Sequence, residues 1–566
     1  MRSRIPATLC ALALVVAACS AQPSPTTLPP SSTSTTTTLT TPSTTTTPLP
    51  EVLVAEVSIG VDAPITSLNP FSDDPGRFVP GNLVWAVVYD IDPATWTKVP
   101  DVVVALPSRS GGITVNDDGT MTVRYEIVDG AVWSDGVPIT GDDVAFTAEV
   151  MRDLAERGVG TVDPVMATLL EATAEGRVAT LTFAEPTLVV EDALWVVVPS
   201  HALEGAGPIE TLDAAAWPSG GPFVVDGFEP AGGVRFVRNE AYWKTDDDGR
   251  RLPYLEAVTI EAPDPVEPMS PVPGFVLRDY DVASVAPTAG DVDRMADAVA
   301  RGAVFHRVRT PIIEQLTFDF SDERFTVNPN SVNEFVEFRR AVAGAIDPVR
   351  LLDDADVPWL PEASGLLVPV GESAWSRYRN APSARPELPP GAATVLTTTG
   401  NAAERPRIAE ALASVFNELG VAYASRLEDS QVFFQQTLVE GTYDLGLWAW
   451  VAADGTYRGR LGLMERLDPA TSPPAGNYGR WGSGATDTEG ARRFSEIVAE
   501  ARSTVDPDRF EELVHEAEAI LATELPLIPL FSRGSGLAVW PDRITGVVHN
   551  GSRSGFTWNV ERWRKG

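Results

Sequence analysis

The spacing of apolar residues changes from alternating to helical between residues 121 and 154. Apolar and polar side chains alternate over residues 121–127, and this period of two predicts a half-buried strand. Thr140 and Asp143 then stand at capping-box spacing, and the apolar residues behind them recur at helical intervals, at Val144, Ala148, Met151 and Leu154. This region therefore predicts a strand followed by a helix.

Later segments repeat this mixture of periods. Residues 315–320 predict a strand, and helical spacing returns in three groups: Phe335, Phe338, Val342 and Ile346; Ile408, Ala411, Leu412, Val415, Phe416 and Leu419; Phe510, Leu513, Val514, Ala517 and Leu521. With 48 Pro and 45 Gly among 566 residues, the chain has many loops. The pattern predicts an α/β protein of more than one lobe and leaves the topology open.

The first residues carry an export pattern. Arg2 and Arg4 precede an apolar run over residues 9–18, which is too short to span a bilayer and fits the core of a signal peptide. Cys19 follows Val-Ala-Ala, a sequence that resembles the lipobox of bacterial lipoproteins, where the cysteine receives a diacylglycerol before cleavage in front of it. We therefore expect a signal peptide over residues 1–18 and a lipid anchor on Cys19, with ordinary signal cleavage nearby as the alternative.

A low-complexity segment follows the anchor. Residues 20–50 are almost wholly Thr, Ser and Pro, with no charge and almost nothing apolar to bury. This composition predicts a disordered tether over residues 19–50, which at about 3.1 Å per residue extends to roughly 90 Å at most. The Ser and Thr side chains suit a plain spacer, and they also suit glycosylation.

Charge and residue counts argue against several classes of function. With 43 basic and 78 acidic residues the net charge is −35, which disfavours binding to a phosphate backbone, so we expect no nucleic-acid partner. The four His are widely separated, and no H-E-x-x-H, G-x-S-x-G or Walker pattern occurs. Cys10 lies in the segment to be removed, which excludes a disulfide or a multi-thiolate metal site in the mature chain. We expect no enzyme, metal or cofactor, while a triad assembled from distant segments stays an alternative.

Five stretches in order along the chain resemble the family 5 extracellular solute-binding proteins, which are the oligopeptide, dipeptide and nickel receptors of ABC importers. The most distinctive is Trp133-Ser134-Asp135-Gly136-Val137-Pro138 with Asp142-Asp143-Val144-Ala145-Phe146 after it. The others are Ser67-Leu68-Asn69-Pro70; Gly221-Pro222-Phe223 with Arg238-Asn239-Glu240-Ala241-Tyr242-Trp243; Phe338-Arg339-Arg340-Ala341-Val342 with Ala345-Ile346-Asp347-Pro348; and Glu524-Leu525-Pro526-Leu527-Ile528-Pro529-Leu530.

This resemblance implies an α/β protein with the two-lobed, periplasmic-binding-protein-like (Venus flytrap) fold and an inserted subdomain in the first lobe. Carried onto this sequence, it predicts a first lobe from residues 51–85, 212–308 and 536–566, an insertion over residues 86–211 and a second lobe over residues 309–535. The chain would cross between the lobes near residues 307–311 and 532–537, where two glycines suit a change of backbone angles.

Most of the matching residues suit structural roles. Trp133 brings a large apolar surface, and Asp347-Pro348 is expected to end a helix, because Pro disfavours helical backbone in the residue before it. Two places depart from the family pattern. Ser219-Gly220-Gly221-Pro222 replaces Gly-Thr-Gly-Pro, and a Gly-x-Asp region survives only as Asp279-Tyr280-Asp281.

The resemblance also places a pocket loop after the strand that contains Trp448 and Trp450. In the family an Asp of this loop pairs with the α-amino group of a bound peptide, and Asp454 is the candidate here, although one extra residue separates it from Trp450. A carboxylate in a closed cleft pairs well with an ammonium group. Trp448 and Trp450 share a strand face by their i, i+2 spacing, so both ligand stacking and core packing explain them.

Three further residues complete the predicted ligand contacts. Arg480 offers a partner for a ligand carboxylate, with a salt bridge at the surface or between the lobes as the equal alternative. Trp481 offers apolar contact, and Asn69 offers hydrogen bonds from the opposite wall.

The resemblance implies capture of a small ligand, expected to be an oligopeptide or a similar solute with a cationic end, by closure of the lobes rather than by catalysis. The implied partners are an ABC permease with its ATPase, and the membrane through Cys19. We expect a monomer at the outer face of the cytoplasmic membrane. The alternatives are an orphan sensing lipoprotein without transport and a cell-surface hydrolase.

Overall fold

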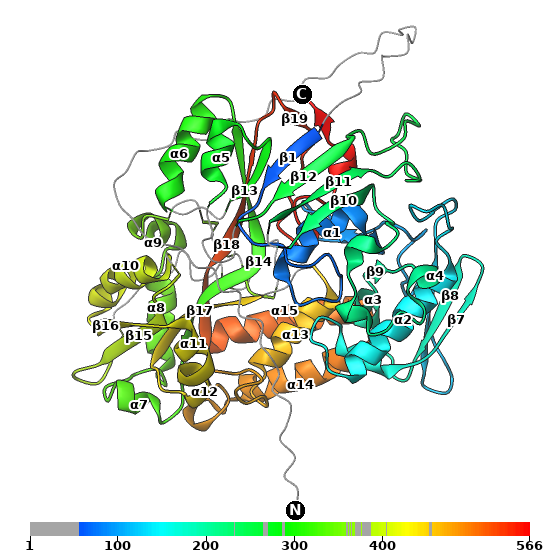
Figure 1. Ribbon diagram of the computed structural model, residues 1–566. Coiled ribbons are helices and arrows are strands. Elements are labelled where there is room, and N and C mark those ends of the chain that lie inside the picture. The colour runs from blue at the N-terminus through cyan, green and yellow to red at the C-terminus, as the bar shows by residue number, and fades with distance from the viewer. Residues whose placement is uncertain are drawn as a thin grey trace, which may run out of the picture.

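The computed structural model describes residues 56–566 apart from 231, 264–269, 286–288, 358–359, 362, 364, 368–374, 376–385, 403 and 452–454. The predicted signal peptide, the tether, Cys19 and Asp454 therefore lie outside the described residues. Within them the chain is a mixed α/β structure organised around one large sheet (Figure 1).

This sheet has ten strands and runs through both halves of the molecule. In spatial order the strands are β10 (Phe223–Glu229), β11 (Gly233–Arg238), β12 (Ala257–Glu261), β1 (Glu56–Gly60), β13 (Val282–Val285), β18 (Leu527–Val539), β14 (Val304–Phe318), β17 (Leu445–Val451), β15 (Ala393–Thr399) and β16 (Ala422–Glu428). Figure 1 shows the half with β1 and β10 to β13 at the top and the half with β15 to β17 at the lower left, joined by β14 and β18.

The two joining strands form an antiparallel pair with an interruption. The ladder runs from Val304 opposite Val539 to Arg309 opposite Gly534, and resumes where Ile313 stands opposite Ser532. Pro311 lies in the gap and has no N–H to donate. The Ser532 hydroxyl bridges the gap instead, because it accepts from the Thr310 N–H at 3.0 Å and donates to the Thr310 carbonyl at 2.8 Å. The interruption, at residues 310–312 and 533, overlaps the segments where the sequence predicts the crossings, and both the crossings and the lobe boundaries stay predictions.

A second, four-stranded antiparallel sheet lies within the predicted insertion. Its order is β5 (Ile113–Val115), β6 (Met121–Glu126), β8 (Val178–Phe183) and β7 (Leu169–Glu175), and α2 (Gly141–Glu156) packs against it. The strand and helix predicted from apolar spacing are thus confirmed as β6 and α2. The capping box is also present, with the Thr140 N–H donating to the Asp143 carboxylate at 2.9 Å.

Two large hydrophobic clusters fill the two halves. One combines the upper half of the sheet with the insertion and includes Trp133, which is 1% exposed. The other covers the lower half with the later helices, and confirms the three predicted helical groups as α8, α10 and α15. The principal helices of this half are α8 (Val336–Ala345), α9 (Pro348–Asp354), α10 (Glu404–Leu419), α13 (Tyr457–Leu467), α14 (Glu489–Ser503) and α15 (Pro507–Glu524).

The other α-helices and strands are mostly short, apart from the 12-residue α6. The helices are α1 (Phe78–Val84), α3 (Val190–Ala193), α4 (Ser200–Leu203), α5 (Val272–Leu277), α6 (Ala289–Ala300), α7 (Arg324–Val327), α11 (Ser430–Val432) and α12 (Leu438–Glu440). The strands are β2 (Ala86–Val87), β3 (Tyr89–Ile91), β4 (Lys98–Pro100), β9 (Val196–Val197), β19 (Ile544–Thr545) and β20 (Arg564–Lys565).

The expected role of Asp347-Pro348 needs a correction. Helix α8 already ends at Ala345, and Asp347 caps the next helix by accepting from the Val349 N–H at 3.0 Å. Pro348 occupies the first helical position of α9, where its missing N–H would have no partner in any case. The pair therefore begins a helix.

Candidate functional site

A small pocket lies in the lower half of the molecule, between the central sheet and the chain that follows α13. It has room for about one water molecule. Its lining comes from β14, β17, the start of β18, the end of α13 and the loop after it: Thr317, Trp448, Trp450, Leu467, Asn477, Tyr478, Gly479, Trp481, Pro526 and Leu527. Three of the side chains predicted from the sequence, Trp448, Trp450 and Trp481, are thus brought together here.

Two aromatic rings form the solvent side of this pocket. Of the ten lining residues only Trp450 and Tyr478 are partly exposed, and the others are buried. Their rings stack at a centroid distance of 5.7 Å and an interplanar angle of 20°. The guanidinium of the exposed Arg466 lies 5.5 Å from the centre of the Trp450 ring. The mouth therefore offers a flat aromatic surface with a cation beside it.

The floor of the pocket carries polar atoms without partners. The Thr317 hydroxyl and the indole N–H groups of Trp448 and Trp481 are buried and have no hydrogen-bond partner among the residues that the structure describes. Trp448 packs edge-on against Phe433 and Tyr443, and Trp481 packs edge-on against Phe494. Both Trp side chains thus pack in the core, and both line the pocket.

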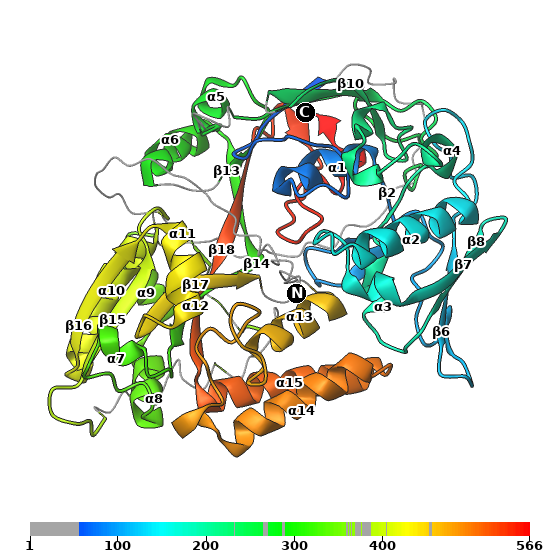
Figure 2. The ribbon, with the colours of Figure 1, turned by 60° about the horizontal axis from the view of Figure 1, so that its bottom comes forward.

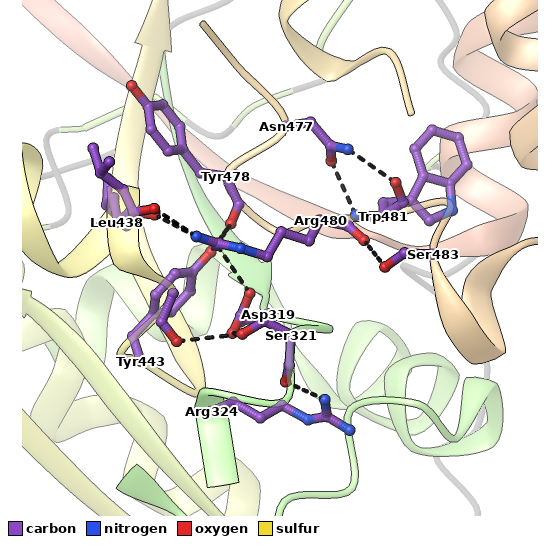
Figure 3. Close-up of polar contacts among 12 residues, drawn as sticks. Asp319, Ser321, Arg324, Leu438, Tyr443, Asn477, Tyr478, Arg480, Trp481 and Ser483 are labelled. Atoms are coloured by element: carbon purple, nitrogen blue, oxygen red, sulfur yellow. Dashed lines mark hydrogen bonds and ion pairs between the residues drawn. The ribbon is translucent and has the colours of Figure 1, made fainter. Parts of the chain in front are cut away.

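Arg480 lies behind the pocket and is engaged within the protein (Figure 3). Its guanidinium lies 3.3 Å from the Asp319 carboxylate and donates to the carbonyls of Tyr478 at 2.5 Å, Val439 at 2.8 Å and Leu438 at 3.3 Å. Asp319 is fully buried; burial raises its pKa to about 7, although a Ser321 hydrogen bond and Arg480 pull it down. In this structure Arg480 neutralises a buried carboxylate.

We expect Arg480→Met to destabilise the protein in a pH-dependent manner. A pKa of about 7 lies above that of an unfolded Asp, so the Asp319 contribution to stability is present at low pH and is lost as the pH rises through 7. Without Arg480 the ionised form loses its guanidinium, and we expect a loss of about 3 kcal/mol at pH 8.5 and a smaller one at pH 5.

Urea unfolding of the two proteins at both pH values measures this difference. Arg492→Met is the control, because Arg492 forms a solvent-exposed pair with Asp487 at 2.6 Å. Equal losses at both pH values for Arg480→Met would contradict the assignment of Asp319.

Asn69 does not line the pocket. Asn69 is 1% exposed, and its amide donates to the carbonyls of Ile209 at 2.7 Å and Leu212 at 3.0 Å and accepts from the Phe71 N–H at 2.9 Å. It ties its loop to residues 209–212. Asp454 is outside the described residues, and the residue after it, Gly455, approaches the insertion so closely that a Cβ would lie 2.1 Å from the Trp96 carbonyl oxygen.

Sequence reasoning missed a buried charge cluster that joins α3 and Lys98 to the first turn of α13. Asp192 is 3% exposed; its carboxylate accepts from Lys98 at 2.6 Å and from the Arg458 N–H at 2.9 Å. Arg458 also lies 3.4 Å from Asp163. Burial raises the pKa of the neighbouring Glu191 to about 7, while Lys98 lowers it. Figure 2 shows α13 beside α3 of the insertion.

His549 does not stand in a hydrolytic triad. The His549 ring lies 3.0 Å from the Ser535 hydroxyl, but its Nδ1 has no partner among the described residues, whereas a triad needs a carboxylate there. Burial and the nearby His306 lower the pKa of His549 to about 4. No cluster of three or more His, Cys, Asp or Glu suited to a metal ion occurs in the described part of the chain.

Other proteins resemble this chain over most of its length. An uncharacterized lipoprotein of Mycobacterium tuberculosis is 24% identical over 517 residues, covering 82% of this chain and 86% of the relative. Two solved structures share the fold: a periplasmic EDTA-binding protein, EppA (TM-score 0.69, 18% identity, 90% of this chain and 96% of that one), and an oligopeptide ABC transporter's periplasmic oligopeptide-binding protein from Thermotoga maritima (TM-score 0.64, 18% identity, 88% and 94%).

These likenesses bear out the two-lobed α/β fold of periplasmic binding proteins. None of the helices in the described residues is long and apolar enough to cross a bilayer. The model of the bacterial extracellular solute-binding proteins, family 5, matches residues 109–461, which is more than half of the chain. The family and these structural neighbours are binding proteins rather than enzymes. The chain is a member of the family 5 bacterial extracellular solute-binding proteins.

Proposed function

We propose that this protein captures an oligopeptide against the aromatic mouth formed by Trp450 and Tyr478, with one small group of the ligand entering the pocket, and delivers it to an ABC importer. The observation that supports this most is the pocket itself, because a flat aromatic mouth stands over unpartnered donors. A peptide offers both matching features, planar amides and carbonyl oxygens. The Thermotoga maritima neighbour is named for oligopeptide binding, which favours the same ligand class.

The remaining parts of this function follow from the sequence. Asp454, two residues before the Thr456 cap of α13, is proposed to pair with the peptide's ammonium group. Cys19 is proposed to hold the monomeric protein on the outer face of the cytoplasmic membrane, where a permease and its ATPase receive the ligand. A single acyl chain is a marginal anchor, so more than one is expected.

Mass spectrometry of the protein purified from its native host tests this function. We expect denaturation to release peptides and the mature N-terminus to carry an acylated Cys19. The released ligand should bind the parent protein and bind Trp450→Ala more weakly, because that change removes one ring of the stacked mouth. Trp558→Ala is a matched control, since this Trp is partly exposed like Trp450 and lies outside the pocket lining.

A released sugar or lipid would overturn the peptide assignment and leave the receptor role standing. Equal affinity of the released ligand for the parent and for Trp450→Ala would show that the pocket is not its binding site.

A further inference from the structure

The unpartnered polar atoms of the pocket floor belong to a larger group on one face of the central sheet. Gln315 stands opposite Trp448, and Thr317 and Thr397 flank Gly446 on its two neighbouring strands. Directly paired residues share a face, so these side chains lie together. Gln315, Thr317 and Thr397 are buried, and the side-chain polar atoms of all three have no hydrogen-bond partner among the described residues.

The Trp448 ring occupies the middle of this face. A Cβ on Gly446 would lie 2.1 Å from that ring, so the indole covers Gly446 and only glycine fits beneath it. The ring atoms nearest Gly446 belong to the six-membered edge of the indole, so the N–H lies on the other edge of the ring, where it is buried and has no partner among the described residues. Trp481 adds a second unpartnered indole N–H from the loop that closes the pocket.

Burying these polar groups is unfavourable unless another molecule supplies the missing hydrogen bonds. A buried donor without an acceptor costs about 1–3 kcal/mol, and folded proteins keep few of them. An indole N–H can only donate, and the pocket has room for about one oxygen atom the size of a water. The missing partner is therefore an acceptor oxygen. An ammonium group does not suit this floor, because two of its three polar groups cannot accept.

We propose that the pocket floor is a subsite for a ligand oxygen, a carbonyl or a carboxylate, held by the indole N–H groups of Trp448 and Trp481 and by the Thr317 hydroxyl. This inference rests on the proposed function and adds the orientation of the ligand. The bound ligand has this oxygen in the pocket, and the planar group that bears the oxygen lies against the Trp450 and Tyr478 rings at the mouth.

Indole N–H resonances of the ¹⁵N-Trp-labelled mature protein test the subsite with two small probes, acetamide and acetate. We expect at least one probe to shift the Trp448 and Trp481 signals saturably, identified by their loss in Trp448→Phe and Trp481→Phe. Saturation by acetamide indicates a carbonyl and saturation by acetate a carboxylate. The absence of a saturable shift with either probe would overturn the subsite.

Two isosteric variants separate binding from packing. Thr317→Val removes a hydroxyl that lines the pocket, whereas Thr397→Val removes an unpartnered hydroxyl of the same sheet face that does not. We expect Thr317→Val to weaken probe binding about three- to tenfold and Thr397→Val to leave it unchanged. Neither should lower the stability of the ligand-free protein, because both hydroxyls lack protein partners.

The outcomes distinguish the subsite from the function on which it rests. Unchanged probe binding in Thr317→Val would overturn the subsite, since it would leave only a resident water on the floor. If the co-purified ligand binds parent and Thr317→Val equally, the subsite fails and the receptor function stands. If no ligand co-purifies and the probes still saturate both indoles, the subsite stands and the proposed function fails.

Discussion

We expect Arg405→Met to lower the free energy of unfolding by about 3 kcal/mol, because it leaves a buried carboxylate with half of its partners. Glu314 is fully buried on β14, and the guanidinium of Arg405 approaches it to 2.9 Å. Arg533 of β18 supplies the second contact, at 2.7 Å. Burial raises the pKa of Glu314, but the two guanidiniums outweigh this and hold it below its ordinary value.

The measurement is urea unfolding at neutral pH, where Glu314 is ionised. Arg407→Met is the control two positions along the same helix, because its 3.3 Å contact to Asp356 is largely solvated and should contribute less than about 1 kcal/mol. Adding Glu314→Gln to Arg405→Met should recover part of the loss, since the uncompensated charge is removed. A loss in Arg405→Met no larger than that of the control would contradict the role of this charge group.

The second large effect is expected for Trp448→Ala, which should lower the free energy of unfolding by about 3–5 kcal/mol through the cavity it leaves. The Trp448 side chain is 1% exposed and packs edge-on against Phe433 at 5.9 Å and Tyr443 at 5.8 Å. Far-UV circular dichroism during urea unfolding measures the loss.

Trp450→Ala is the matched control on the same strand face. Trp450 keeps part of its surface in solvent at the pocket mouth, so less apolar area is lost and we expect about 1 kcal/mol. Similar losses of unfolding free energy in the two variants would contradict the assignment of Trp448 to the core and of Trp450 to the pocket mouth.

Local patterns predicted local structure well in this chain. The alternation that gives β6 and the Thr140–Asp143 capping box that begins α2 depend on residues a few positions apart, so the sequence carries them directly. The resemblance of five ordered motifs likewise predicted the family and the two-lobed fold. Asp347 shows the limit of this reasoning, because a Pro after an Asp marks both the end of one helix and the cap of the next.

The site was harder to predict because its contacts join distant segments. Gln315 and Thr317 are two polar residues at i, i+2 near the end of β14, but only the strand register shows that they share a face with Trp448. The Arg480 side chain contacts Asp319 and three carbonyls. Its direction depends on the backbone turn at Arg480, where φ is 56°. The contact between Asp192 and the first turn of α13 has no local signature at all.

The order of strands in the central sheet also constrains when the molecule can fold. β1 pairs with β12, so that Glu56 meets Ala257, and β13 pairs with β18, so that Val282 meets Val539. Contacts between such distant segments make folding slow, because a long loop must close before the pairing is gained. Since β18 separates β13 from β14, the two halves of the sheet stay unjoined until residue 539 has left the ribosome. A chain predicted to be exported therefore completes its central sheet only after the β18 segment is free to pair with β13 and β14.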